Sequence, residues 1–297
     1  MKSTAEVRIT LKNILFLTDF SEPSEIALPF AIAVAREYGA RVHALHVLIP
    51  NAFTYTTPEL GNLAMEAQEE ESEAAMRRVD AQLAGLPHET TVVRGGGIWP
   101  AVAESIRDNS VDLIVLGTHG RTGAEKILLG SVAEEIFRRS SVPVLTIGPA
   151  VKNGAHSAAR FRRILYATDF SQHADAALPY AVSFAQENQA DLLLLHAIPE
   201  RKSGKETSNA VSVAEAMHAL HELVPASSEL WCRPEPLVRC EKPAVAILEA
   251  AEQNGADLIV LGIRGHKGVP GADTHLEGSL AHKIVAYAEC PVLTVRG

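Results

Sequence analysis

Three glycines and a serine near the middle of the sequence have a spacing that could hold a phosphate group. Gly117 ends the apolar run LIVLG, Gly120 follows it closely, and Gly130-Ser131 opens a helix-like segment. Glycine lets the backbone approach a ligand closely, and successive N–H groups in such a loop form an anion site. The first N–H groups of a helix also attract phosphate. We expect Ser131 to cap that helix or to offer its hydroxyl to the anion.

The two best-known phosphate motifs do not match this segment. Gly130, and not the lysine of a P-loop, directly precedes Ser131, and the stretch Gly117-Thr118-His119-Gly120 lacks the G-x-G of a dinucleotide fingerprint. His119 has no carboxylate nearby in sequence to orient it as a base, so we assign it no chemical role. A second glycine run, at residues 95–97, is typical of a turn before a helix. Glycine spacing by itself leaves phosphate binding and a plain loop both open.

Alternating strands and helices must position this segment. Apolar runs predict buried strands, and the segments between them predict helices. In the first half the strands are expected at 13–18, 41–48, 89–94, 112–117 and 143–148, and the helices at 23–39, 65–85, 100–109 and 131–140. Gly39 suits a helix C-cap, whereas Pro29 should kink or delay its helix. Strands without a polar face indicate a parallel sheet covered on both sides, which binds ligands where the strand order reverses.

The sequence of the first half is repeated, with changes, in the second half. NILFLTDFSEPSEIALPFAIAVA returns as RILYATDFSQHADAALPYAVSFA, VDLIVLGTHG as ADLIVLGIRG, and VPVLTIG as CPVLTVR. A repeat of this length indicates two homologous domains. We therefore predict an α/β protein with two doubly wound, five-stranded, parallel-sheet domains in tandem, at residues 1–150 and 163–297, joined by a linker at about 151–162.

These motifs resemble the universal stress protein family. The glycine pattern is similar to the nucleotide signature of that family, and so are ILFLTDFS, ALHV and GSVAEEIFRRSSVPVLTIG. The likeness covers nearly the whole chain as two fused domains. It implies a Rossmann-like fold that binds adenine nucleotides, because many members with this glycine pattern bind ATP and members without it generally do not. ATP, with or without Mg²⁺, is therefore the expected ligand, and a stress response the expected role.

By position, the resemblance places a nucleotide in the first domain. Asp19 would bind the ribose or adenine end, Val47 would meet the adenine through its backbone, and Arg121 could add charge at the phosphates. A turn or cap role for Asp19 and a solvent-exposed position for Arg121 stay open. The implied set is Thr18, Asp19, Val47, Gly117, Gly120, Arg121, Gly130, Ser131 and Val132.

The second glycine loop departs from the pattern. Nine residues separate Gly120 from Gly130, whereas twelve separate Gly265 from Gly278. The longer loop brings acidic side chains to the phosphate end, where they would repel a triphosphate. ATP binding by the second domain therefore stays open at its matching positions, Asp169, Ala197, Gly262, Gly265, Gly278 and Ser279. The nearby His266, Asp273, His275, Glu277 and His282 lack a recognised zinc spacing, so we expect a solvated loop and no metal site.

Composition narrows the partners. The formal net charge of -9 argues against nucleic acid and anionic membranes. The three cysteines, Cys232, Cys240 and Cys290, form no CxxC pair, and their odd number fits a reducing cytoplasm. No apolar run approaches the roughly 20 residues of a membrane helix.

Three functions fit this sequence. The first is an ATP-binding regulatory sensor without strong catalysis. The second is an interaction protein with incidental nucleotide, in which the apolar edge strands at 143–148 and 291–296 pair with another chain. The third is a slow ATPase or adenylate-transferring enzyme. We expect binding rather than catalysis, because the motifs supply no positioned acid–base group. The resemblance to the universal stress protein family implies that the last strands are dimerisation elements and that the two lobes pair with each other, and a homodimer of chains stays open.

Overall fold

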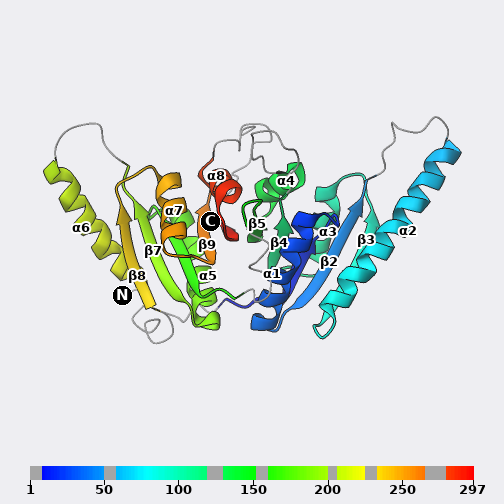
Figure 1. Cartoon of the computed structure of the whole chain (residues 1–297), viewed down its shortest axis with the longest axis horizontal. Helices are drawn as coiled ribbons and strands as arrows, with labels where there is room; N and C mark the ends of the chain where they lie inside the picture. Colours follow the sequence, from blue (N-terminus) through cyan, green and yellow to red (C-terminus); the bar gives the residue numbers. More distant parts are fainter. Residues whose placement is uncertain are drawn as a thin grey trace.

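The computed structural model describes residues 9–49, 58–118, 130–151, 160–199, 206–224, 233–264 and 279–297. Strands and helices alternate along both halves of the chain (Figure 1). The first half holds β1 (Asn13–Leu17), α1 (Glu22–Tyr38), β2 (Arg41–Leu48), α2 (Pro58–Leu83), β3 (His88–Arg94), α3 (Ile98–Asp108), β4 (Leu113–Gly117), α4 (Ser131–Arg139) and β5 (Val144–Ile147). The second holds β6 (Arg163–Thr168), α5 (Gln172–Asn188), β7 (Asp191–Ala197), α6 (Glu206–Leu223), β8 (Arg233–Arg239), α7 (Pro243–Gln253), β9 (Leu258–Ile263), α8 (Leu280–Tyr287) and β10 (Val292–Arg296).

The strands form one sheet in the order β3-β2-β1-β4-β5-β10-β9-β6-β7-β8. Neighbouring strands are parallel within each half, and β5 and β10 pair antiparallel with Leu145 opposite Leu293. Figure 1 shows the two halves on either side of this seam, with α2 and α6 at the outer ends. The predicted fold class is confirmed, because each half is a doubly wound α/β unit with five parallel strands, and the β5–β10 seam joins the two sheets into one.

Helices cover both faces of the sheet because side chains of a strand alternate between its faces. On β1, Phe16 belongs to the apolar cluster under α1 and α2, whereas Leu15 belongs to the cluster under α3 and α4. Both side chains are almost fully buried. The aliphatic runs in the sequence therefore mark strands that are buried on both sides, as parallel sheets require.

The first helix of each half continues through a proline. α1 begins directly after Ser21 and contains Pro29, and α5 contains Pro179 at the corresponding place. The expected delay of the helix start is therefore wrong: burial of the α1 face outweighs the one hydrogen bond that a proline removes. Gly39 ends α1 in the left-handed conformation with φ 65°, as predicted for a C-cap.

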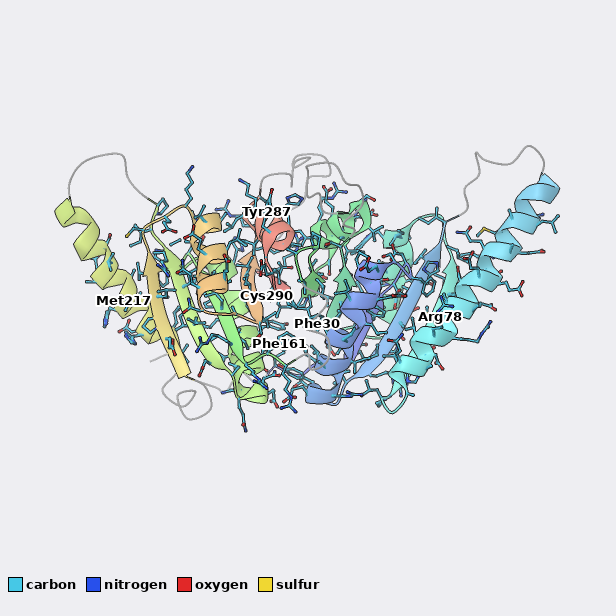
Figure 2. The ribbon with its side chains drawn as sticks, in the orientation of Figure 1. Phe30, Arg78, Phe161, Met217, Tyr287 and Cys290 are labelled. Carbon is cyan, nitrogen blue, oxygen red and sulfur yellow. The ribbon has the colours of Figure 1, made fainter. Side chains whose placement is uncertain are left out.

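Aromatic side chains join the two halves beneath the sheet. The ring centroid of Phe161 lies 6.3 Å from that of Phe30 in α1 (Figure 2). It lies 5.6 Å from that of Phe184 in α5. The Tyr38 hydroxyl lies 3.0 Å from that of Ser183 across the same junction. Phe161 lies near the end of the predicted linker, yet only 3% of it is exposed. The described end of this segment is thus part of the core.

A buried thiol and a buried phenol should make the stability of the fold fall at alkaline pH. Burial raises the pKa of Cys290 from 9.0 to about 12, and it also raises that of Tyr166 from 10.0 to about 12. A raised folded-state pKa contributes fully below the unfolded value and is lost as pH rises through the folded one. We expect the urea-unfolding free energy to hold below pH 9 and to fall by on the order of 2–4 kcal/mol by pH 11. Cys290→Ala should flatten this slope, and an unchanged slope would contradict the assignment.

Candidate nucleotide-binding site

The candidate site lies where the strand order reverses. β1 lies between β2 and β4, with Leu17 opposite Leu116. Thr18 follows β1, Gly117 ends β4 and Val47 lies near the end of β2, so all three reach the carboxyl edge of the sheet. This edge, between the first strand and the fourth, is where doubly wound sheets bind their ligands. The structure thus brings three residues of the expected nucleotide-binding set to one edge of the sheet.

A strained phenylalanine shapes the loop after β1. Phe20 has φ 60°, a left-handed conformation that is costly for a residue with a Cβ. Its N–H donates to Thr18 Oγ1 at 3.0 Å, and its ring centroid lies 4.4 Å from that of His46. His46 Nδ1 donates to the Thr18 carbonyl at 2.8 Å, which fixes the proton on Nδ1 because a carbonyl only accepts. Phe170 and His196 repeat the same contact in the second half.

Asp19 is exposed at the tip of this loop. Its Oδ1 accepts hydrogen bonds from the backbone N–H of Ser21, at 3.1 Å, and from the Ser21 hydroxyl. The turn role that the sequence left open for Asp19 is therefore present. An ionised carboxylate accepts several hydrogen bonds, so this turn is compatible with a further donor such as a ribose hydroxyl.

Close packing explains why glycine is needed at position 117, and the sequence alone did not reveal this. A Cβ at this position would lie 2.2 Å from the carbonyl oxygen of Pro23, because the end of β4 packs directly against the start of α1. Gly262 repeats the constraint, with a Cβ position 2.1 Å from the carbonyl oxygen of His173. Neither residue has a positive φ, so close packing alone demands glycine. Glycine at these two positions is therefore required whether or not a ligand binds.

The start of α4 differs from the prediction. Gly130 occupies the N-cap and Ser131 is the first helical residue, so the expected cap role of Ser131 is wrong. A helix capped by Ser131 would have its first helical residue at Val132. α4 begins one residue before that, because the Glu134 N–H donates to the Gly130 carbonyl at 2.9 Å. The N-cap glycine has no side chain to cap this end, and the N–H groups of Ser131 and Val132 precede the first intrahelical bond. Such an end has the polarity of an anion site.

The second half caps its matching helix differently. Ser279 is the N-cap of α8, and its hydroxyl accepts from the His282 N–H at 3.2 Å. Asp169 is exposed at the position of Asp19, and its Oδ1 accepts from the Ser171 N–H at 3.0 Å. Burial acts to raise the pKa of Asp169, but hydrogen bonds from Ser171 and the charge of Arg264 outweigh it and lower that pKa. Gly262 is the next-to-last residue of β9, and Ala197 ends β7.

Several predicted residues lie outside the described part of the chain. These are His119, Gly120 and Arg121 in the first loop, and Gly265, His266, Asp273, His275, Glu277 and Gly278 in the second. Within the described ranges, no three His, Cys, Asp or Glu side chains gather as metal ligands would. In those same ranges no helix has the length and apolar character needed to cross a bilayer.

Sequence reasoning missed a groove of about 410 Å³ beside the candidate site. It runs between α3 and the strands β2 and β3, and it ends at Gly95–Gly97. Glu89 and Thr91, two of its lining residues, alternate along β3 and place polar groups where a core face was expected. Its inner wall includes His43, whose pKa is lowered by burial despite the neighbouring Glu89 carboxylate at 3.6 Å. The polar alternation along β3 was the signal available in the sequence.

Comparison with known proteins settles the family. The sequence model of the universal stress protein family matches residues 10–148 and again residues 160–296. The chain belongs to the universal stress protein family. It is a tandem member, because each half matches separately.

Individual relatives agree with this assignment. A universal stress protein of Methanocaldococcus jannaschii is 36% identical over 46% of this chain and 81% of its own length. One from Mycolicibacterium smegmatis is 26% identical and covers 96% of this chain and 97% of itself. The crystal structure of a universal stress protein from Archaeoglobus fulgidus superposes with a TM-score of 0.68 at 24% identity, over 96% and 98% of the two chains, which shows a shared fold. A universal stress protein solved in complex with cAMP aligns at a TM-score of only 0.36 and 19% identity, over 46% of this chain and 97% of its own, too low to bear on the ligand here.

Proposed function

We propose that this tandem universal stress protein binds ATP in its first lobe and acts as a regulatory nucleotide sensor in a stress response. The observation that carries the proposal is the start of α4. A glycine caps this helix without a side-chain hydrogen bond, and a doubly wound sheet binds ligands at the strand-order reversal. The N–H groups at the start of a helix that lack intrahelical partners can donate to the phosphates of a nucleotide.

Each end of the nucleotide would have its own partners. The phosphates would lie against the backbone of Gly130, Ser131 and Val132, with Gly120 and Arg121 of the same loop contributing. Asp19 would accept from the ribose hydroxyls, as acidic residues do in other doubly wound folds, and the backbone of Val47 would meet the adenine. ATP would shift a conformational equilibrium by its different affinities for the two states. Mg²⁺, if it binds, would come with the phosphates.

The second lobe is proposed to bind ATP weakly or not at all. Its matching serine, Ser279, already uses its hydroxyl to cap α8, and the charge of Arg264 acts on Asp169. The acidic residues of its longer loop add repulsion toward a triphosphate. We therefore expect about one ATP per chain.

Pairing of the lobes in solution and the location in the cytoplasm also belong to this proposal. The β5–β10 seam supports pairing, since Thr294 Oγ1 donates to the Val144 carbonyl at 3.3 Å across it. The same seam occupies the strand edges that the interaction hypothesis needs free. A homodimer of chains would then have to use another surface.

The direct test is to identify nucleotide bound to the purified protein. Denaturing the protein and analysing the supernatant by chromatography should release about one adenine nucleotide per chain, and calorimetry on the emptied protein should show ATP binding. An empty supernatant, together with no thermal shift on adding ATP, would reject the proposal. Steady release of phosphate or AMP that Asp19→Ala abolishes would favour the enzyme hypothesis instead.

Asp19→Ala should weaken ATP binding about tenfold, because it removes a charged acceptor from the ribose end. Calorimetric titration of the variant measures this loss. Asp169→Ala makes the same change in the second lobe and should leave the affinity within about twofold. Equal losses in both variants would contradict a single ATP site in the first lobe.

A further inference from the structure

Position 296 is one place where the two halves of the repeat differ sharply. The strand VPVLTIG of the first half ends with Gly148, and its counterpart CPVLTVR ends with Arg296. Both residues lie beside the antiparallel seam, where each lobe's last strand approaches the last helix of the other lobe. The two sides of the seam can therefore be compared directly.

Arg296 reaches from the second lobe to the end of α4 in the first. Its Nη2 donates to the carbonyls of Phe137 and Arg138, at 2.8 and 2.9 Å. Its Nη1 lies 3.5 Å from the carbonyl oxygen of Arg264, at the start of the second glycine loop. Its Nε is buried and has no hydrogen-bond partner among the residues that the structure describes. One guanidinium thus ties the C-terminal turn of α4 to the other lobe.

Gly148 occupies the opposite side of the seam and has no side chain that could bond to the other lobe. A Cβ on Gly148 would lie 2.3 Å from the carbonyl oxygen of Val285 in α8, so backbone meets backbone there. Val285 is the counterpart of Phe137 in the repeat. The same helix turn is thus bonded by an arginine in one lobe and closed by a glycine contact in the other.

The arginine acts on the helix whose other end is the proposed phosphate site. The last carbonyls of a helix lack intrahelical partners, and a cation there stabilises the helix. Burial lowers the pKa of Arg296, but an arginine stays charged at neutral pH. α4 has only nine residues, or about 13 Å of length at 1.5 Å per residue, so fixing its last turn restrains its first.

We propose that Arg296 is a positioning residue that sets the phosphate affinity of the first lobe from the second. It holds α4 so that the backbone N–H groups at Gly130–Val132 face the phosphates together. The inference rests on the proposed nucleotide site, and it deepens that proposal by making the first lobe's affinity depend on the second lobe.

The test compares ATP with adenosine in an Arg296→Gln variant of the full chain. Calorimetry should show ATP binding weakened roughly 5- to 20-fold, whereas adenosine, which has no phosphate, should change by less than about twofold. Arg296→Lys keeps the charge but not the two-pronged donor, so its loss should be intermediate. Hydrogen exchange of residues 131–139 should quicken in Arg296→Gln, with residues 280–287 unchanged.

Arg239→Gln is the matched control, because Arg239 lies on β8 of the same lobe and donates to Gln253 at 2.6 Å, away from the seam. It should leave ATP affinity and exchange of α4 unchanged. An unchanged ATP affinity in Arg296→Gln, or equal losses of ATP and adenosine, would overturn this inference and leave the proposed function standing. A wild-type chain that binds no adenine nucleotide would overturn the proposed function itself.

Discussion

Gly130→Val should abolish ATP binding, with a loss of about 100-fold or more, since charged hydrogen bonds to the phosphates would be lost together. Gly130 has φ −60° and ψ 147°, a conformation that valine adopts readily. The substitution therefore adds a branched side chain at the phosphate position without straining the backbone. Calorimetry measures the affinity, and thermal unfolding should show an unchanged midpoint without ATP.

The control separates loss of the ligand from loss of the fold. ATP at 100 times its dissociation constant stabilises the wild type by about 2.7 kcal/mol, and Gly130→Val should lose this shift. Gly278→Val introduces the same side chain at the matching position of the second lobe and should keep it. If Gly130→Val retains wild-type affinity, the phosphates do not lie at the start of α4.

Gly117→Ala should destabilise the first lobe by about 3 kcal/mol or more. The added methyl would lie 2.2 Å from the Pro23 carbonyl oxygen. A backbone atom cannot rotate away as a flexible side chain would, so β4 and α1 must separate. Urea unfolding followed by circular dichroism measures the change.

Gly96→Ala is the comparison for this effect, because a Cβ at Gly96 meets nothing within 4 Å. We expect that variant to stay within about 0.5 kcal/mol of the wild type. Gly262→Ala should reproduce the large loss in the second lobe, where the His173 carbonyl is equally close. A wild-type unfolding midpoint in Gly117→Ala would mean that β4 and α1 do not approach as described.

The architecture could be derived from the sequence because its signals are local or repeated. Aliphatic runs such as that of β1 mark buried strands, Gly39 marks a helix end, and the repeat sets two copies of one fold. Thr18, Asp19, Val47 and Gly117 could also be assigned to one edge of the sheet, because the carboxyl ends of parallel strands share that edge.

The remaining features depend on contacts between distant residues. The sequence around Gly117 does not indicate its contact with the carbonyl of Pro23. The sequence around Arg296 does not indicate its hydrogen bonds to the end of α4. Ser131 and Ser279 have the same local pattern, yet their helices begin at different residues. One-residue shifts of a helix start follow from packing and cannot be read from capping preferences.

Joining two copies in one chain has a consequence for how they can diverge. In a twofold-symmetric dimer of identical subunits, every substitution appears on both sides of the contact. An arginine that suits one side would then also replace the glycine on the other, where no Cβ fits. In a single chain the two positions need not be identical, so one side can have Arg296 while the equivalent position on the other side stays glycine, Gly148. A single chain with two copies can therefore give its lobes different roles, which twofold symmetry would forbid.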